Sequence, residues 1–112
     1  MSELVMRRAL IDRDTSLKEL PREFLDNLAW RIRFEGWGDC WMWTGSVNGN
    51  GRPMIFVDRK MQSAQRYLMH LFYEFGPDWY VMPKLDVCKH QNCMFPRHLV
   101  ITNEGTAGYY RG

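Results

Sequence analysis

Hydrophobic side chains recur with a helical period in two stretches of the sequence. The first runs from Pro21 to about Phe34, with proline in the first turn and Gly36 just beyond the end. Its apolar stripe consists of Phe24, Leu25, Leu28, Ala29 and Ile32. The second runs from Ser63 to Phe75 and ends at Gly76-Pro77. Its stripe consists of Tyr67, Leu68, Leu71, Phe72 and Phe75. Two helices packed against one core are therefore predicted.

Between these stretches the pattern changes to the alternation that is typical of β-strands. The segments DCWMWTG and RPMIFVDRKMQ are predicted as two strands, and SVNGNG between them as a turn. The pairs Asn48-Gly49 and Asn50-Gly51 favour a hairpin because both residue types tolerate positive φ. Pro53 fits an edge or the first residue of its strand. The pattern predicts a small α+β fold.

Residues 1–20 show only weak periodicity and are predicted to be an N-terminal arm or short helix, followed by one domain over residues 21–112. The 112 residues are 46% hydrophobic and 25% charged, which excludes a wholly disordered chain, a coiled coil and a collagen-like repeat. No apolar segment suits a signal peptide or a membrane span. We therefore expect a cytoplasmic protein without a membrane partner.

The net charge of +2 is too small to indicate a nucleic-acid partner by itself, but its distribution is uneven. Residues 52–66 contain four basic residues and one acidic residue, and residues 84–98 contain three and one. The basic side chains of the two segments are Arg52, Arg59, Lys60, Arg66, Lys84, Lys89 and Arg97. They are candidates for contacts with DNA phosphates. The alternative is a solvated strand edge kept soluble by its charges.

Three cysteines, an odd number, do not favour a closed disulfide framework. In the segment LDVCKHQNCMFPRHL, four residues separate Cys88 from Cys93, and four more precede His98. With Cys40 returned by the strand-turn-strand segment, these residues would form a closed tetrahedral site for structural zinc. His90 competes as a ligand, but its closeness to Cys88 makes that geometry cramped. The other use of such thiols is to be buried as small hydrophobic groups.

With these motifs in place, residues 39–107 resemble the phage-type HNH homing endonucleases of the His-Me finger (ββα-metal) superfamily. The similarity lies in Cys40-Trp41-Met42-Trp43-Thr44-Gly45, Gly51-Arg52, Ala64-Gln65-Arg66, Gly76-Pro77, Cys88-x4-Cys93 and Pro96-x-His98-Leu99. The resemblance implies a zinc-stabilised ββα-metal domain that acts on DNA. It also implies that Arg66 occupies the position of an arginine beside the scissile phosphate.

The sequence departs from the family at the positions that perform the cleavage. Asp86 stands where the family has its general-base histidine, and Ala107 where an asparagine binds the catalytic divalent ion. Gln65 replaces the histidine of the A-H-R motif, and Phe95 replaces an asparagine. An ordinary aspartate, with a pKa of about 3.9 against about 6.5 for histidine, is a poor general base near neutral pH. Asp86 could instead bind Mg²⁺, but then no base remains.

These observations predict a zinc-stabilised, HNH endonuclease-like phage protein that binds DNA in the cytoplasm of an infected bacterium and has lost most or all nuclease activity. One alternative is an active endonuclease that depends on a divalent ion such as Mg²⁺. The other is a protein-directed inhibitor of a host enzyme. For that reading the candidate anchors are exposed aromatic side chains at Trp79, Tyr80, Tyr109 and Tyr110. The oligomeric state is left open.

Overall fold

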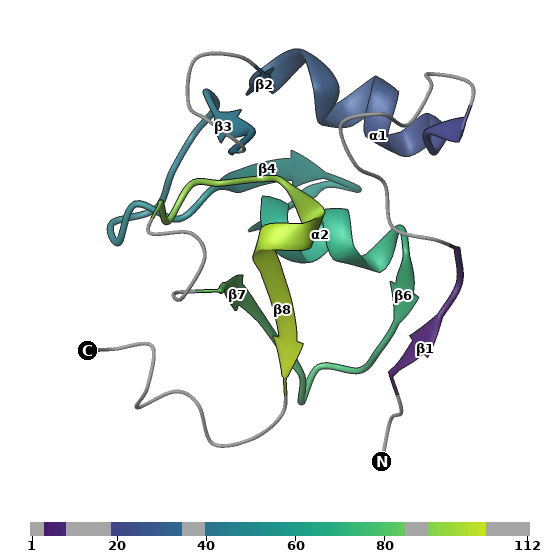
Figure 1. Cartoon of the computed structure of the whole chain (residues 1–112). Helices are drawn as coiled ribbons and strands as arrows, with labels where there is room; N and C mark the ends of the chain where they lie inside the picture. The colour runs from purple at the N-terminus through teal and green to yellow at the C-terminus, as the bar shows by residue number, and fades with distance from the viewer. Residues whose placement is uncertain (1–3, 9–18, 35–39, 85–89, 103–112) are drawn as a thin grey trace.

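The order of helices and strands mixes short strands with two α-helices (Figure 1). The structure, a computed structural model, describes residues 4–8, 19–34, 40–84 and 90–102. The elements are β1 (Val5–Met6), α1 (Arg22–Asn27), the 3₁₀ turn η2 (Ala29–Arg31), β2 (Ile32–Arg33), β3 (Met42–Trp43), β4 (Met54–Val57), β5 (Lys60–Ser63), α2 (Ala64–His70), β6 (Tyr73–Glu74), β7 (Tyr80–Pro83), η3 (Pro96–His98) and β8 (Leu99–Thr102).

The strands pair as four separate antiparallel ladders: β1 with β6, β2 with β3, β4 with β5, and β7 with β8. The longest ladders place Phe56 opposite Met61 and Val81 opposite Ile101. An isolated bridge between Met42 and Cys93 joins β3 to the segment before η3. The α+β class predicted from the sequence is therefore confirmed, as a small globule of short antiparallel hairpins around α2.

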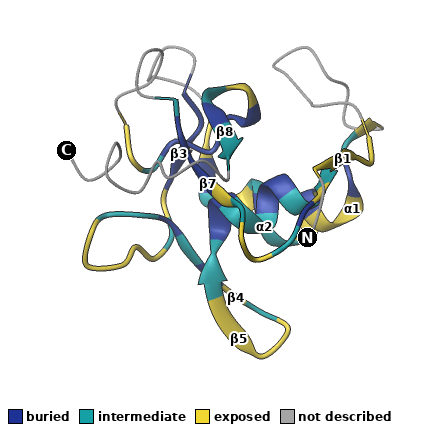
Figure 2. Cartoon of the chain, turned by 90° about the horizontal axis from the view of Figure 1, so that it is seen from below, coloured by how far each residue is buried: buried dark blue, intermediate teal, exposed yellow. Residues whose placement is uncertain are grey.

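Helix α2 lies at the centre of the core (Figure 2). The Ser63 hydroxyl accepts a hydrogen bond of 3.1 Å from the Arg66 N–H, which caps the first turn. Leu68 is fully buried, and the other apolar residues of the predicted stripe pack into or against the same cluster. From the first stripe Phe24, Leu28 and Ile32 are buried, whereas Leu25 is exposed.

Both helices are shorter than the predicted ranges, because strand pairing takes over their C-terminal residues. Helix α1 ends at Asn27, and after η2 the chain becomes extended so that Ile32 pairs with Trp43. Helix α2 ends at His70, because Tyr73 and Glu74 pair with β1. Hydrogen bonds to distant strands thus override a periodicity that continues past both helix ends.

The prediction of one long strand over RPMIFVDRKMQ is wrong. Asp58 and Arg59 both adopt left-handed backbone conformations, with φ of 55° and 65°, and turn the chain into the β4–β5 hairpin. Two residues with positive φ form the turn that matches the natural twist of a hairpin. The hairpin predicted around SVNGNG is reduced to a single bridge between Val47 and Pro53.

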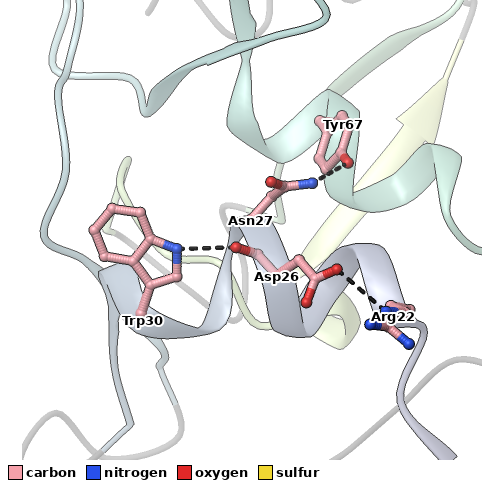
Figure 3. Close-up of polar contacts among 5 residues, drawn as sticks. All are labelled: Arg22, Asp26, Asn27, Trp30 and Tyr67. Atoms are coloured by element: carbon pink, nitrogen blue, oxygen red, sulfur yellow. Dashed lines mark hydrogen bonds and ion pairs between the residues drawn. The ribbon is translucent and has the colours of Figure 1, made fainter.

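Helix α1 is attached to α2 through one polar contact (Figure 3). The Asn27 side chain donates a hydrogen bond of 2.9 Å to the Tyr67 hydroxyl. Burial raises the pKa of Tyr67, so this hydroxyl stays protonated at neutral pH. On the outer side of α1, Arg22 and Asp26 form a surface ion pair of 3.5 Å. A pair so exposed contributes little to stability.

The described part of the predicted N-terminal arm includes a strand, β1, that pairs with β6. The arm also contacts the end of α2, because the Arg7 guanidinium donates a hydrogen bond of 3.1 Å to the His70 carbonyl. The His70 ring stacks on Phe75 with 3.9 Å between ring centroids and 4° between the planes. Within the described ranges, no helix is long and apolar enough to cross a membrane.

The environment of His70 predicts a loss of stability in mild acid. Burial lowers its pKa, and the charges of Arg66 on α2 and Arg7 after β1 lower it further. The unfolded chain has an ordinary histidine pKa near 6.5, so below that pH it binds the proton first and stability falls until the folded pKa is reached. Between about pH 7 and about pH 5, we expect the urea midpoint of the wild type to fall more than that of His70→Phe. Equal falls in both proteins would contradict this account.

Candidate metal centre and cationic groove

Two cysteines and one histidine converge at one point of the described structure. The His98 Nδ1 atom lies 3.7 Å from the Cys40 Sγ atom and 3.6 Å from the Cys93 Sγ atom. All three ligand atoms lie within 4.8 Å of one another. Cys40 and Cys93 are buried and His98 is half-buried. These are three of the four zinc ligands predicted from the sequence. The fourth, Cys88, lies outside the described residues.

The backbone brings the two cysteines together by running segment 40–43 beside segment 92–94. The Trp43 N–H donates to the Asn92 carbonyl at 3.0 Å, and the Met94 N–H donates to the Trp41 carbonyl at 2.7 Å. Beyond these segments Pro96 starts η3, because the fixed φ of proline suits the first position of a helical turn. This turn brings His98 back over the cysteines.

Packing also orients the histidine ring. The Phe95 ring meets the His98 ring edge to face, with 4.9 Å between centroids and an angle of 88°. The His98 backbone N–H donates a hydrogen bond of 2.9 Å to the Phe95 carbonyl, which closes the turn that carries the ring. Phe95 itself is buried and also contacts Trp41 at 4.9 Å. Phe95 is therefore part of the wall of this site.

The spacing of the three ligand atoms fits a zinc ion. Zinc bonds of about 2.3 Å to sulfur and about 2.0 Å to nitrogen, at the tetrahedral angle, put sulfur and nitrogen about 3.5 Å apart. The two distances of 3.6 and 3.7 Å are close to this value. The group can therefore hold a zinc-like ion.

A buried glutamine connects this centre to the rest of the domain, and the sequence did not indicate its role. Gln65 is 0% exposed, and its amide donates bonds of 2.9 Å to the carbonyls of both Gln91 and Cys93. Its side-chain oxygen accepts from the Arg52 guanidinium at 2.8 and 3.2 Å. The signal in the sequence that could have indicated this role is the position of Gln65, a polar residue next to Arg66 on the apolar stripe of the second predicted helix.

Arg52 and Arg66 line one groove between the start of β4, α2 and β7. The groove has a volume of about 300 Å³. Its lining consists of Asn48, Asn50, Arg52, Met54, Ser63, Arg66, Tyr80, Val81 and Met82. Among the described residues, this lining contains two cationic side chains and no carboxylate. An anionic group of a ligand would therefore enter a positive environment.

Both arginines are held in place by backbone carbonyls. Arg52 donates to Val81 at 3.0 Å, and Arg66 donates to Trp79 at 2.6 Å and to Gly76 at 2.9 Å. Burial lowers the pKa of Arg66 and Asp78 opposes that shift, but arginine remains charged at neutral pH. The two charges are thus fixed rather than carried on mobile side chains.

The other predicted DNA contacts that the structure describes are spread over the surface and are absent from the groove lining. Arg59 and Lys60 are exposed at the tip of the β4–β5 hairpin, and Arg97 is exposed on η3. Lys84 is half-buried just after β7. Asp86, Lys89 and Ala107 lie outside the described residues.

The remaining predicted residues divide in the same way. His90, the competing ligand, is exposed and is not part of the metal group found in the described residues. Of the aromatic candidates, Tyr80 is exposed and Trp79 is half-buried, whereas Tyr109 and Tyr110 lie outside the described residues. The burial of Trp79 weakens the expectation that it anchors a protein partner.

Comparisons with protein-family models, with curated protein sequences and with solved structures found no match for this chain.

Proposed function

We propose that this chain is a zinc-stabilised, HNH endonuclease-like phage protein that binds DNA through its cationic groove and cuts it poorly or not at all. The observation that carries the proposal is the pair of fixed arginines, Arg52 and Arg66, in a groove to whose lining the described part of the chain contributes no carboxylate. Such contacts neutralise phosphates and position the nucleic acid. Arg66 at the position of the family's phosphate-side arginine supports the same reading.

The zinc ion of this proposal is structural. Cys40, Cys93 and His98 supply three ligands, and we propose Cys88 as the fourth. Three thiolates and one imidazole leave no open position for water on the ion. The ion would fix the segment that carries β7 and β8 against β3, and it would take no part in cleavage.

The groove predicts a defined response to one added negative charge. Asn50→Asp places a carboxylate in the groove lining, and its side chain is exposed, so the fold should tolerate the change. We expect roughly fivefold weaker DNA binding at about 0.1 M salt, because the carboxylate repels the phosphates. Fluorescence anisotropy with a labelled oligonucleotide measures this.

A matched control is Arg22→Gln, which makes the same change in net charge on the outer side of α1. It should bind DNA as the wild type does. Contacts with about four phosphates of duplex DNA, from the groove and from Arg59 and Lys60 at the hairpin tip, would give a log–log salt slope of roughly −3.6. Equal loss in both variants, or no salt-dependent binding by the wild type, would refute the proposed groove.

The loss of cleavage predicts a specific result in a plasmid assay. With Mg²⁺ or Mn²⁺ the wild type should produce at most a trace of nicked plasmid, because Asp86 is a poor base at neutral pH. Asp86→His combined with Ala107→Asn should increase nicking if both groups fall at the family's positions. Robust cutting by the wild type that Asp86→Ala abolishes would favour the active-nuclease alternative.

A further inference from the structure

A second hollow lies beside the β4–β5 hairpin, on the side of η2. Its volume is about 160 Å³. Its lining consists of Arg31, Trp43, Gly45, Ser46, Met54, Ile55, Phe56 and Met61. A cavity of about 150 Å³ is large enough to take up one benzene-sized ring. This hollow therefore has the size for a single flat aromatic group.

Two large apolar side chains border the hollow and remain in solvent. Phe56 is 63% exposed and Met61 is 55% exposed, and the two face each other across the ladder. The hairpin that carries them projects from the body of the molecule, and its outer part is exposed (Figure 2). Neither side chain belongs to the buried core cluster. An apolar pair held this way is suited to contact a ligand.

The base of the hollow is rigid. Trp43 is 3% exposed, and its indole N–H donates a hydrogen bond of 2.8 Å to the Ser46 carbonyl. A Cβ atom at Gly45 would lie 2.8 Å from the Trp43 ring, so only glycine fits there without a shift. At the rim, the Arg31 guanidinium lies 4.0 Å from the centroid of the Trp30 ring, which is 66% exposed. Aromatic surface and a cationic group thus occur together.

The hollow adjoins the cationic groove. Met54 lines both, and Phe56 follows it by two positions on the same strand face. Two residues of a strand span about 7 Å. A nucleic-acid strand whose phosphate lies at Arg52 and Arg66 could therefore bring an attached base to Phe56.

We infer that the hollow binds an unstacked base of single-stranded DNA whose backbone occupies the cationic groove. This inference rests on the proposed function and adds the form of DNA. Bases stack on exposed aromatic side chains without requiring a sequence, and cationic groups alternate with such side chains in single-strand sites. In a duplex the faces of the bases are covered by their neighbours, so a paired base cannot enter the hollow without being extruded.

The test compares a labelled single-stranded DNA of mixed sequence with the duplex of the same sequence. Phe56→Ala should weaken single-strand binding by about five- to a hundredfold and duplex binding by much less. Phe56→Trp should retain the single-strand affinity, because it keeps a stacking surface. Leu25→Ala, which removes an exposed apolar side chain from α1, serves as the matched control and should change neither affinity.

A strand with an abasic position gives an independent readout. If Phe56 stacks on a base, removing bases along the strand should reduce wild-type affinity and have little further effect on Phe56→Ala. The inference is overturned if Phe56→Ala binds the single strand as tightly as the wild type while Asn50→Asp still weakens binding. If neither Phe56→Ala nor Asn50→Asp weakens binding, or if the wild type binds neither form of DNA, the proposed function is overturned as well.

Discussion

Removing zinc from the protein should unfold it at neutral pH. The ligands come from segments 40–43 and 92–98, which are far apart in sequence. For structural zinc sites the apparent binding free energy of about 10–16 kcal/mol is also folding free energy. A typical domain has a free energy of unfolding of about 5–15 kcal/mol, so losing the zinc should remove as much stability as the whole domain has. A strong chelator should therefore abolish the near-ultraviolet circular dichroism of the tryptophans, and Cys93→Ser should not fold.

Elemental analysis of the natively purified protein should give one zinc ion per chain. His90→Ala is the matched control, because it removes the competing imidazole and should retain both the metal and the fold. Cys88→Ser tests the fourth ligand and should lose zinc as Cys93→Ser does. A well-folded natively purified protein without zinc would show that the three residues pack without a metal.

Replacing Gln65 should cause the second-largest loss of folding stability, after the loss of zinc. Gln65→Ala removes two bonds to Arg52 and two bonds to backbone carbonyls, at a position that is 0% exposed. A buried polar group left without its partner costs about 1–3 kcal/mol, so we expect a total loss of roughly 3–5 kcal/mol in urea unfolding. Zinc should also leave this variant faster, since the Cys93 carbonyl loses its partner.

Gln62→Ala provides the comparison within the same segment. Gln62 donates one bond, of 3.2 Å, to the Val57 carbonyl, so its loss should cost at most about 1 kcal/mol. Gln65→His, the residue usual in the resembled family, has one ring N–H when neutral and can retain only one of the donated bonds. It should therefore fall between the other two variants. If Gln65→Ala were as stable as Gln62→Ala, the proposed linking role would be wrong.

The spacing of cysteine and histidine residues predicted the metal-binding group, whereas hydrophobic periodicity did not predict where the two helices end. The predicted ligands Cys88, Cys93 and His98 are close in the chain, and Cys40 is the remaining cysteine of the sequence. The ends of α1 and α2 depend on pairing with β3 and β1, which are distant in sequence. Periodicity indicates which face of a segment is buried, but it does not indicate whether the last residues of that segment pair with a distant strand.

The β4–β5 turn and the hydrogen-bond network of Gln65 are two other features that the sequence did not predict. Asp58-Arg59 lacks the glycine that usually marks a two-residue hairpin turn, so the strand appeared continuous. From the sequence, Gln65 was interpreted only as the residue that replaces the histidine of the resembled family's A-H-R motif. Its four hydrogen bonds join Arg52 to the segment before η3, and this geometry appears only once the chain is folded.

The position of the cysteines also bears on how the chain folds. Cys40 and Cys93 are 53 positions apart, and β4, β5, α2, β6 and β7 all lie between them. A cross-link across a loop of this length reduces the entropy of the unfolded chain, in a disulfide-type estimate, by the equivalent of about 4 kcal/mol. Contacts so distant in sequence form slowly, because the intervening chain must be ordered before the ends meet. The metal centre would thus close late in folding and then hold a whole ββα unit inside one loop.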